Sequence, residues 1–63
     1  MRKKYFVEAL NELQRELIGF INESEFLWKE EIDGIQKDID NLVDEARFLG
    51  FKPVLTSDNR WAL

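Results

Sequence analysis

Hydrophobic residues recur every three or four positions in the first third of the chain. The residues that form this stripe are Phe6, Leu10, Leu13, Leu17 and Phe20, with Ala9 and Ile21 beside them. The positions between them are mainly Glu, Asn, Gln and Arg, a pattern typical of an amphipathic helix with one apolar face. We therefore predict a first helix within residues 1–21, with its regular part at about residues 3–18.

A change of helix is predicted directly after this stripe, at residues 19–22. Gly19 suits the left-handed backbone that ends many helices, and Asn22 with Glu25 has the spacing of a capping box that begins the next one. No proline enforces a break here, and a glycine inside a helix costs only about 1 kcal/mol relative to alanine. One unbroken helix over residues 3–49 therefore stays open as an alternative to a hairpin.

The clearest period in the sequence lies within residues 22–49. Its apolar positions are separated alternately by four and three residues, and most of the others are charged; they are Trp28, Ile32, Ile35, Ile39, Leu42, Ala46 and Leu49. A narrow stripe of this kind over about three heptads is typical of a helix that pairs with another helix. We expect the helix to end at Gly50, with Pro53 preventing its continuation.

The C-terminal segment, residues 50–63, follows a different pattern. Two short runs rich in strand-favouring residues flank residues 57–59, whose Ser-Asp-Asn sequence favours a turn. An isolated two-stranded hairpin is marginal in water, so Trp61 is expected to pack against the helices. The predicted fold is all-α, a helical hairpin of two antiparallel helices with a short C-terminal extended hairpin.

The length of 63 residues allows a single small domain with a marginal core. Neither Cys nor His occurs, so a disulfide or a Cys/His metal site cannot stabilise it. We therefore predict a homo-oligomer, with a dimer favoured, in which two hairpins complete a four-helix bundle. The predicted self-association seam combines both apolar stripes and consists of Phe6, Leu13, Leu17, Trp28, Ile32, Ile35, Ile39 and Leu42.

The whole chain has a net charge of −4 at pH 7, and its acidic residues are concentrated in the middle. Nucleic-acid binding needs clustered Lys and Arg, so this distribution argues against it. An acidic helix face is either a plain solvated surface or one that recognises a basic protein partner through complementary charge. The candidate residues for binding an unidentified protein partner are Asp33, Asp40, Asp44 and Glu45 on this face and Trp61 in the tail.

Residues able to carry out catalysis are scarce. The hydroxyl residues Tyr5, Ser24, Thr56 and Ser57 have neither a His nor a Cys beside them in the sequence to activate or replace them. The carboxylates show no spacing that would converge on a metal ion. We therefore predict a protein that is not an enzyme and that has no catalytic residue, cofactor or metal site.

No segment approaches the ~20 apolar residues of a membrane span. The basic start of the chain meets Glu8 before the core of a signal peptide could form. These features predict a cytoplasmic protein that does not insert into a membrane.

The second half of the chain resembles the end of a winged-helix domain. A helix that contains residues 35–42 is followed by Gly50, a short hairpin and the terminal Trp61-Ala62-Leu63, as that family has a recognition helix, a wing and a final aromatic-x-Leu. The resemblance covers only this half and implies DNA binding, with phosphate contacts from Arg2-Lys3-Lys4, Lys52 and Arg60. The chain departs from the family where bases would be read, because its helix is acidic there.

Together these features predict a non-enzymatic, acidic protein–protein interaction module that self-associates through its helical seam and acts as an adaptor, regulator or inhibitor. Two alternatives remain open. One is a winged-helix-like DNA-binding regulator, and the other is an acidic mimic of nucleic acid that inhibits a DNA-binding protein.

Overall fold

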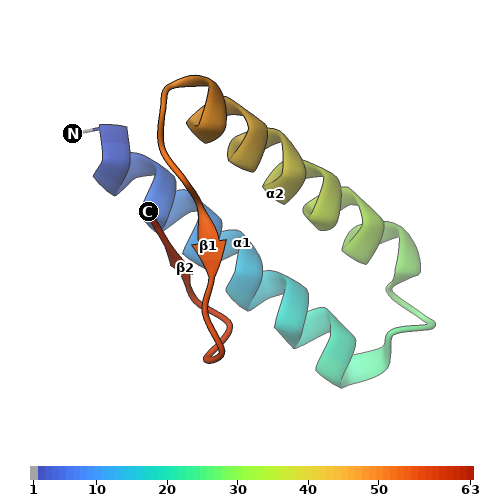
Figure 1. Ribbon diagram of the computed structural model, residues 1–63. Coiled ribbons are helices and arrows are strands. Elements are labelled where there is room, and N and C mark those ends of the chain that lie inside the picture. Colours follow the sequence, from blue (N-terminus) through green and yellow to red (C-terminus); the bar gives the residue numbers. More distant parts are fainter. Residues whose placement is uncertain (1) are drawn as a thin grey trace.

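Two antiparallel helices pack side by side, and a short pair of strands lies against them (Figure 1). This computed structural model describes residues 2–63, and the side chains of residues 3–63. Helix α1 spans Arg2–Ser24, helix α2 spans Lys29–Phe48, and strands β1 (Val54–Leu55) and β2 (Trp61–Ala62) follow. The predicted helical hairpin with a C-terminal extended hairpin is confirmed, and the alternative of one unbroken helix is wrong.

The break between the helices lies at residues 25–28, so its predicted position at residues 19–22 is wrong. The first helix extends beyond residue 21 to Ser24, and the second begins at Lys29 instead of residue 22. By continuing through Gly19, α1 carries Phe20 to a contact with Trp28, with 5.1 Å between the ring centroids. This aromatic contact offsets the small cost of a glycine inside the helix.

The connection after α1 is held by Ser24 instead of the predicted capping box. The Ser24 side-chain oxygen accepts a hydrogen bond from the Leu27 N–H at 3.2 Å, and its carbonyl accepts one from the Trp28 N–H at 3.1 Å. Trp28 precedes α2 without a side-chain cap, while Glu30 and Glu31 lie in the first turn. Their negative charges favour this helix end because they complement the helix dipole.

The end of α2 agrees with the prediction. Gly50 has a φ of 96°, in the left-handed region that favours glycine. Its N–H donates to the Arg47 carbonyl and the Phe51 N–H donates to the Ala46 carbonyl, both at 3.0 Å. This pair of bonds is a Schellman motif, which satisfies the last carbonyls of the helix.

The C-terminal hairpin is short and regular. Strands β1 and β2 are antiparallel, with Val54 opposite Ala62 and Leu55 opposite Trp61. The Asn59 N–H donates to the Thr56 carbonyl at 3.0 Å, and Asn59 has a φ of 60°. A three-residue loop that ends in a left-handed residue is a common hairpin connection, so the predicted turn at residues 57–59 is confirmed.

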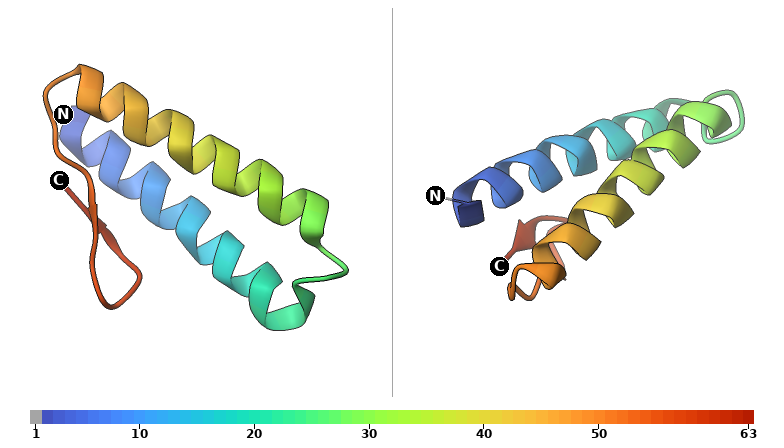
Figure 2. Two further views of the ribbon diagram at one scale, coloured as in Figure 1. Left: turned by 45° about the vertical axis from the view of Figure 1, so that its right-hand side comes forward. Right: turned by 90° about the horizontal axis from the view of Figure 1, so that it is seen from above.

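The core is confined to one end of the helix pair. Buried side chains come from residues 6–17 of α1, residues 39–46 of α2 and Pro53; they are Phe6, Leu10, Gln14, Leu17, Ile39, Val43, Ala46 and Pro53. No residue from 18 to 38 is buried. Seen from above, the helices diverge toward the end where the hairpin lies, and the hairpin covers one face there (Figure 2). We call residues 18–38, which the hairpin does not cover, the open end, and we call the rest of the chain the covered end.

Candidate functional site

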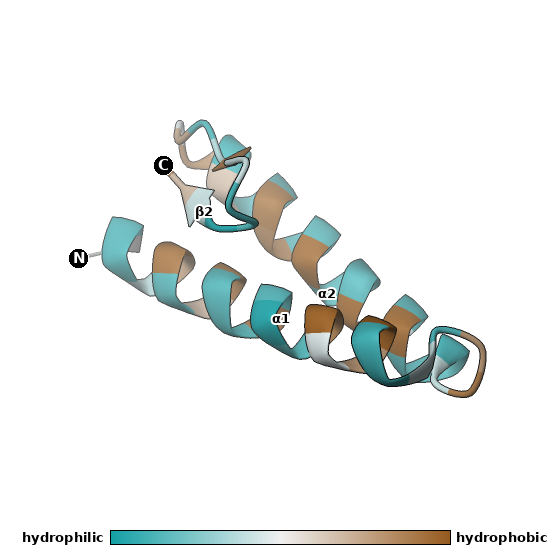
Figure 3. Cartoon of the chain, turned by 90° about the horizontal axis from the view of Figure 1, so that it is seen from below, coloured by the Kyte–Doolittle hydropathy of each residue, from teal (hydrophilic) through white to brown (hydrophobic). Residues whose placement is uncertain are grey.

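The eight residues of the predicted self-association seam separate into two groups. Phe6, Leu17 and Ile39 are buried within a single chain, so a second copy cannot reach them. The remaining five are only partly buried and keep surface that another molecule could cover; they are Leu13, Trp28, Ile32, Ile35 and Leu42. Figure 3 shows that hydrophobic residues line the facing sides of both helices and extend to the connection at the open end.

One apolar stripe lies on the face of the helix pair that the hairpin leaves uncovered. Asn11 faces the hairpin, because its side chain bonds to Trp61. Leu13 and Phe20 lie two and nine residues beyond it, which at about 100° per residue places both on nearly the opposite side of α1. Neither is fully buried.

The corresponding stripe of α2 follows from the burial of two neighbours. Val43 and Leu42 flank the line where α2 meets α1, and Val43 is only 8% exposed while Leu42 keeps more surface. Leu42 therefore lies on the uncovered side, and Ile35, seven residues earlier, shares that side. We call Leu13, Phe20, Ile35 and Leu42 the back face.

Trp61 is bound within the chain by two polar residues of α1. Its backbone N–H donates to the Asn11 side-chain oxygen at 2.6 Å, and its carbonyl accepts from the Asn11 side-chain nitrogen at 3.2 Å. Its indole N–H donates to the side-chain oxygen of Gln14, itself only 8% exposed, at 3.1 Å. Sequence reasoning missed both residues, although their spacing of three on a helix places them on one side.

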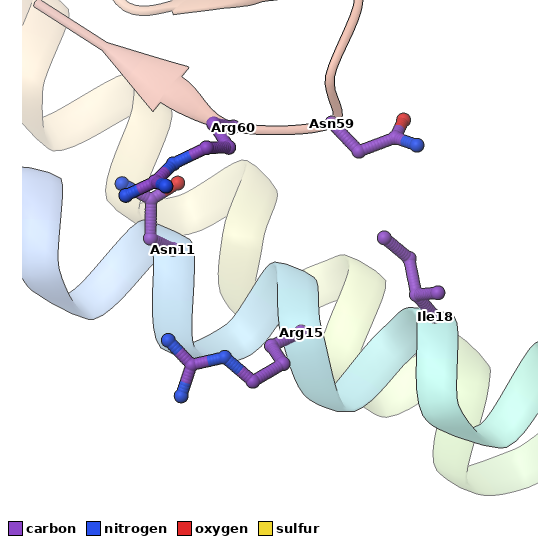
Figure 4. Close-up of a pocket in the computed structure, with 5 residues that line it drawn as sticks. All are labelled: Asn11, Arg15, Ile18, Asn59 and Arg60. Atoms are coloured by element: carbon purple, nitrogen blue, oxygen red, sulfur yellow. The ribbon is translucent and has the colours of Figure 1, made fainter.

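A shallow hollow of about 220 Å³ lies between α1 and the tip of the hairpin. Figure 4 shows the Arg60 guanidinium group beside Asn11, and the Arg15 side chain lying along α1. In the part of the chain that the structure describes, the only ion pair within 4.0 Å joins Lys4 and Glu8. Arg15 and Arg60 both line this hollow, and neither lies within 4.0 Å of an acidic side chain among residues 3–63.

The predicted partner-binding residues do not form one cluster. Three of them are exposed and lie on one side of α2: Asp33, Asp40 and Asp44. They are seven and four residues apart, and residues at these spacings point in nearly the same direction from a helix. Glu45 is exposed but points about 100° away from Asp44. Trp61 lies on β2, where its polar atoms bond to α1.

The open end combines exposed apolar side chains with negative charge. In the connection between the helices, Phe26 is 89% exposed and Leu27 is 75% exposed. Beside them is a hollow of about 420 Å³ lined by Glu25, Phe26, Lys29, Ile32 and Asp33. Residues 18–38 contain six acidic residues and two lysines, a net charge of −4 that equals the net charge of the whole chain.

The described basic residues implied by the winged-helix resemblance all belong to the covered end, where Phe51, next to Lys52, contacts Phe6 near the start of α1. Lys3 and Lys4 are exposed at the start of α1, where Lys4 pairs with Glu8, and the side chain of Arg2 lies outside the described residues. Lys52 and Arg60 are exposed in the C-terminal segment. The exposed side of α2 carries the acidic residues described above.

Two further findings concern residues 2–63. No three or more acidic side chains gather there in a way that could hold a metal ion. None of the helices in this range has the length and apolar character needed to cross a membrane. Comparison with known proteins found no matching family model, no matching curated protein and no matching solved structure.

Proposed function

We propose that this chain is a non-enzymatic protein–protein interaction module that self-associates through its back face to form a dimer. One observation carries this function: the hairpin covers one face of the helix pair, while the opposite face keeps a stripe of partly exposed apolar side chains. Two such faces packed together would complete a four-helix bundle.

The surface area of the chain supports this assembly. The chain exposes 4890 Å², whereas a compact monomer of this length is expected to expose about 4,250 Å². The surplus of roughly 600 Å² approaches the ~800 Å² that each partner buries in a standard interface. The elongated shape, 36 × 20 × 16 Å, provides a long face for such contact.

The charge distribution favours an antiparallel arrangement of the two copies. The open end carries the entire net charge, while the covered end has as many basic as acidic residues. In an antiparallel dimer each acidic open end lies beside the neutral covered end of the other copy. This arrangement avoids like-charge repulsion and is compatible with two-fold symmetry.

Light scattering across a dilution series from high to low micromolar tests the dimer. We expect a mass of twice that of one chain. Ile35→Asp should dissociate or unfold the protein, because Ile35 packs against the core and the change would bury an unpaired charge. Leu42→Gln, which removes apolar surface without adding a charge, should weaken the dimer while circular dichroism shows that the helices persist. Leu27→Asp changes an exposed residue outside the back face and should leave the mass unchanged.

A mass of one chain at every concentration would contradict self-association. An unchanged dimer in both back-face variants would show that another surface makes the contact.

The DNA-binding alternative is tested by titrating duplex DNA at increasing salt. Binding through phosphate contacts would weaken steeply with salt and would be lost when Lys52 and Arg60 are replaced by Gln. The acidic side of α2 favours the opposite outcome, no measurable binding, which leaves the interaction module as the proposed function.

A further inference from the structure

The tip of the open end has the features of a docking surface. Phe26 and Ile32 contribute apolar surface to the hollow of about 420 Å³, and two acidic residues, Glu25 and Asp33, line it together with one basic residue, Lys29. Leu27 extends the apolar area across the connection between the helices. Exposed aromatic residues next to a concave surface are typical anchors in protein interfaces, so this area is suited to binding a partner.

Its charge restricts what that partner can be. The net charge of −4 on residues 18–38 repels other acidic surfaces, including an anionic membrane. A second copy docking tip to tip would bring two equally acidic ends together, which is unfavourable. A partner with apolar residues flanked by Lys or Arg can instead place its apolar side chains in the hollow and its basic groups near the acidic residues.

We propose that the open end binds a basic amphipathic helix of a partner protein. This inference rests on the proposed function as an interaction module, but it uses a different surface from the back face. The part of α2 at the open end, residues 29–38, is about 15 Å long at 1.5 Å per residue. A partner helix of about three turns would match that length, with apolar side chains on Phe26 and Ile32 and its basic residues near Glu25 and Asp33.

The probe is a fluorescein-labelled amphipathic peptide of about fifteen Leu and Lys residues with Leu on one helical face. We expect a rise in fluorescence anisotropy on titration with the full chain, and a weaker response at high salt. A peptide of the same pattern with Glu in place of Lys should not bind. A scrambled Leu/Lys peptide, which cannot form one apolar face, should bind more weakly.

Two phenylalanines provide a matched pair of variants. Phe26 and Phe48 are both 89% exposed, but Phe26 lies at the open end and Phe48 at the opposite end of α2. We expect Phe26→Ser to weaken peptide binding by about thirtyfold, as for the loss of a central anchor. Phe48→Ser should leave the affinity unchanged, and neither exposed residue is needed for folding.

Charge reversal separates the open end from the rest of the acidic side of α2. We expect Glu25→Lys combined with Asp33→Lys to weaken binding by about tenfold. The double variant Asp40→Lys and Asp44→Lys makes the same change of charge in the covered end and should have a much smaller effect.

Four outcomes would overturn the assignment. Equal losses in Phe26→Ser and Phe48→Ser, or binding of the acidic peptide, would show that the open end does not select a basic helix. A larger loss in the Asp40/Asp44 variant would move the partner to the covered end. A lower molar mass in Phe26→Ser but not in the back-face variants would show that a second copy of this chain binds at the open end. If the back-face dimer does not form, peptide binding can still be measured on the single chain.

Discussion

At the scale of single residues, Asn11 acts on β2 as a neighbouring strand would. Its side-chain amide accepts from the N–H and donates to the carbonyl of Trp61, so the outer edge of the strand is occupied at this residue. Gln14 pairs with the indole N–H one turn further along α1. These bonds attach the tail to α1 and bring Trp61 against the core.

Removing the Asn11 amide is expected to loosen this attachment. Asn11→Ala leaves the N–H and carbonyl of Trp61 without their partners, at a cost of about 1–3 kcal/mol in unfolding free energy. Urea unfolding followed by circular dichroism measures this loss. Glu12→Ala, an exposed neighbour on the same helix, is the control and should change stability by less than about 0.5 kcal/mol. Equal effects of the two changes would show that the tail is held elsewhere.

Two isoleucines of α2 report where the core lies. Ile39 is 1% exposed, whereas Ile32 at the open end is only partly buried. Ile39→Ala should cost about 2–5 kcal/mol, close to the whole stability of a domain of this size, because it leaves a cavity. Ile32→Ala should cost clearly less. Thermal unfolding of both proteins makes the comparison, and similar losses would mean that the core extends evenly along the helices.

At the scale of elements, the helix ends are set by different kinds of contact. The end of α2 is a local motif, in which Gly50 adopts the left-handed backbone and two hydrogen bonds close the last turn. The end of α1 depends on residues across the connection, where Phe20 meets Trp28 and Ser24 binds the chain that follows. The two helix ends should therefore respond differently to substitution.

Alanine at two glycines is expected to have opposite effects. Gly19 lies inside α1 with open space where a Cβ would be placed, so Gly19→Ala should stabilise the protein by about 0.5–1 kcal/mol. Gly50→Ala should destabilise it by about 1 kcal/mol, because its positive φ is unfavourable for a residue with a Cβ. Urea midpoints of the two variants test this. Destabilisation by Gly19→Ala would contradict a continuous helix at Gly19 and would favour the predicted break at residues 19–22.

At the scale of the whole molecule, the core and the net charge occupy opposite ends. The covered end contains every buried residue that the structure describes, and the open end accounts for the entire net charge. The C-terminal hairpin contributes to the position of the core, because it packs over only one end of the helix pair (Figure 1), whereas the position of the net charge is set by the sequence. We therefore expect the covered end to be the more stable of the two ends.

Hydrogen exchange should reveal this division. We expect amides of residues 18–38 to exchange at least about tenfold faster than those of residues 39–48, because helix segments with little buried apolar surface open locally. Mass spectrometry of peptic fragments at low micromolar concentration measures both ranges. Uniform protection along α2 would show that the helices open as one unit despite the uneven core.

The sequence alone determined the two amphipathic helical stretches, the end of α2 and the turn of the tail, whereas it left open whether the helices are separate. Each depends on local features: the spacing of apolar residues, the backbone freedom of Gly50, and the turn preference of residues 57–59. Such features act between residues close in the chain, so a single sequence is enough to predict them.

Tertiary structure alone decided where α1 ends, which end contains the core, and what holds Trp61. The signals at Gly19 and Asn22 are worth only about 1 kcal/mol each, and the contact between Phe20 and Trp28, which is of similar magnitude, forms where α1 continues past them. The partners of Asn11 and Gln14 lie 50 and 47 residues further along the chain, and no local pattern encodes such distances. Burial depends on where the hairpin packs, and that position is set by contacts formed only when the whole chain has folded.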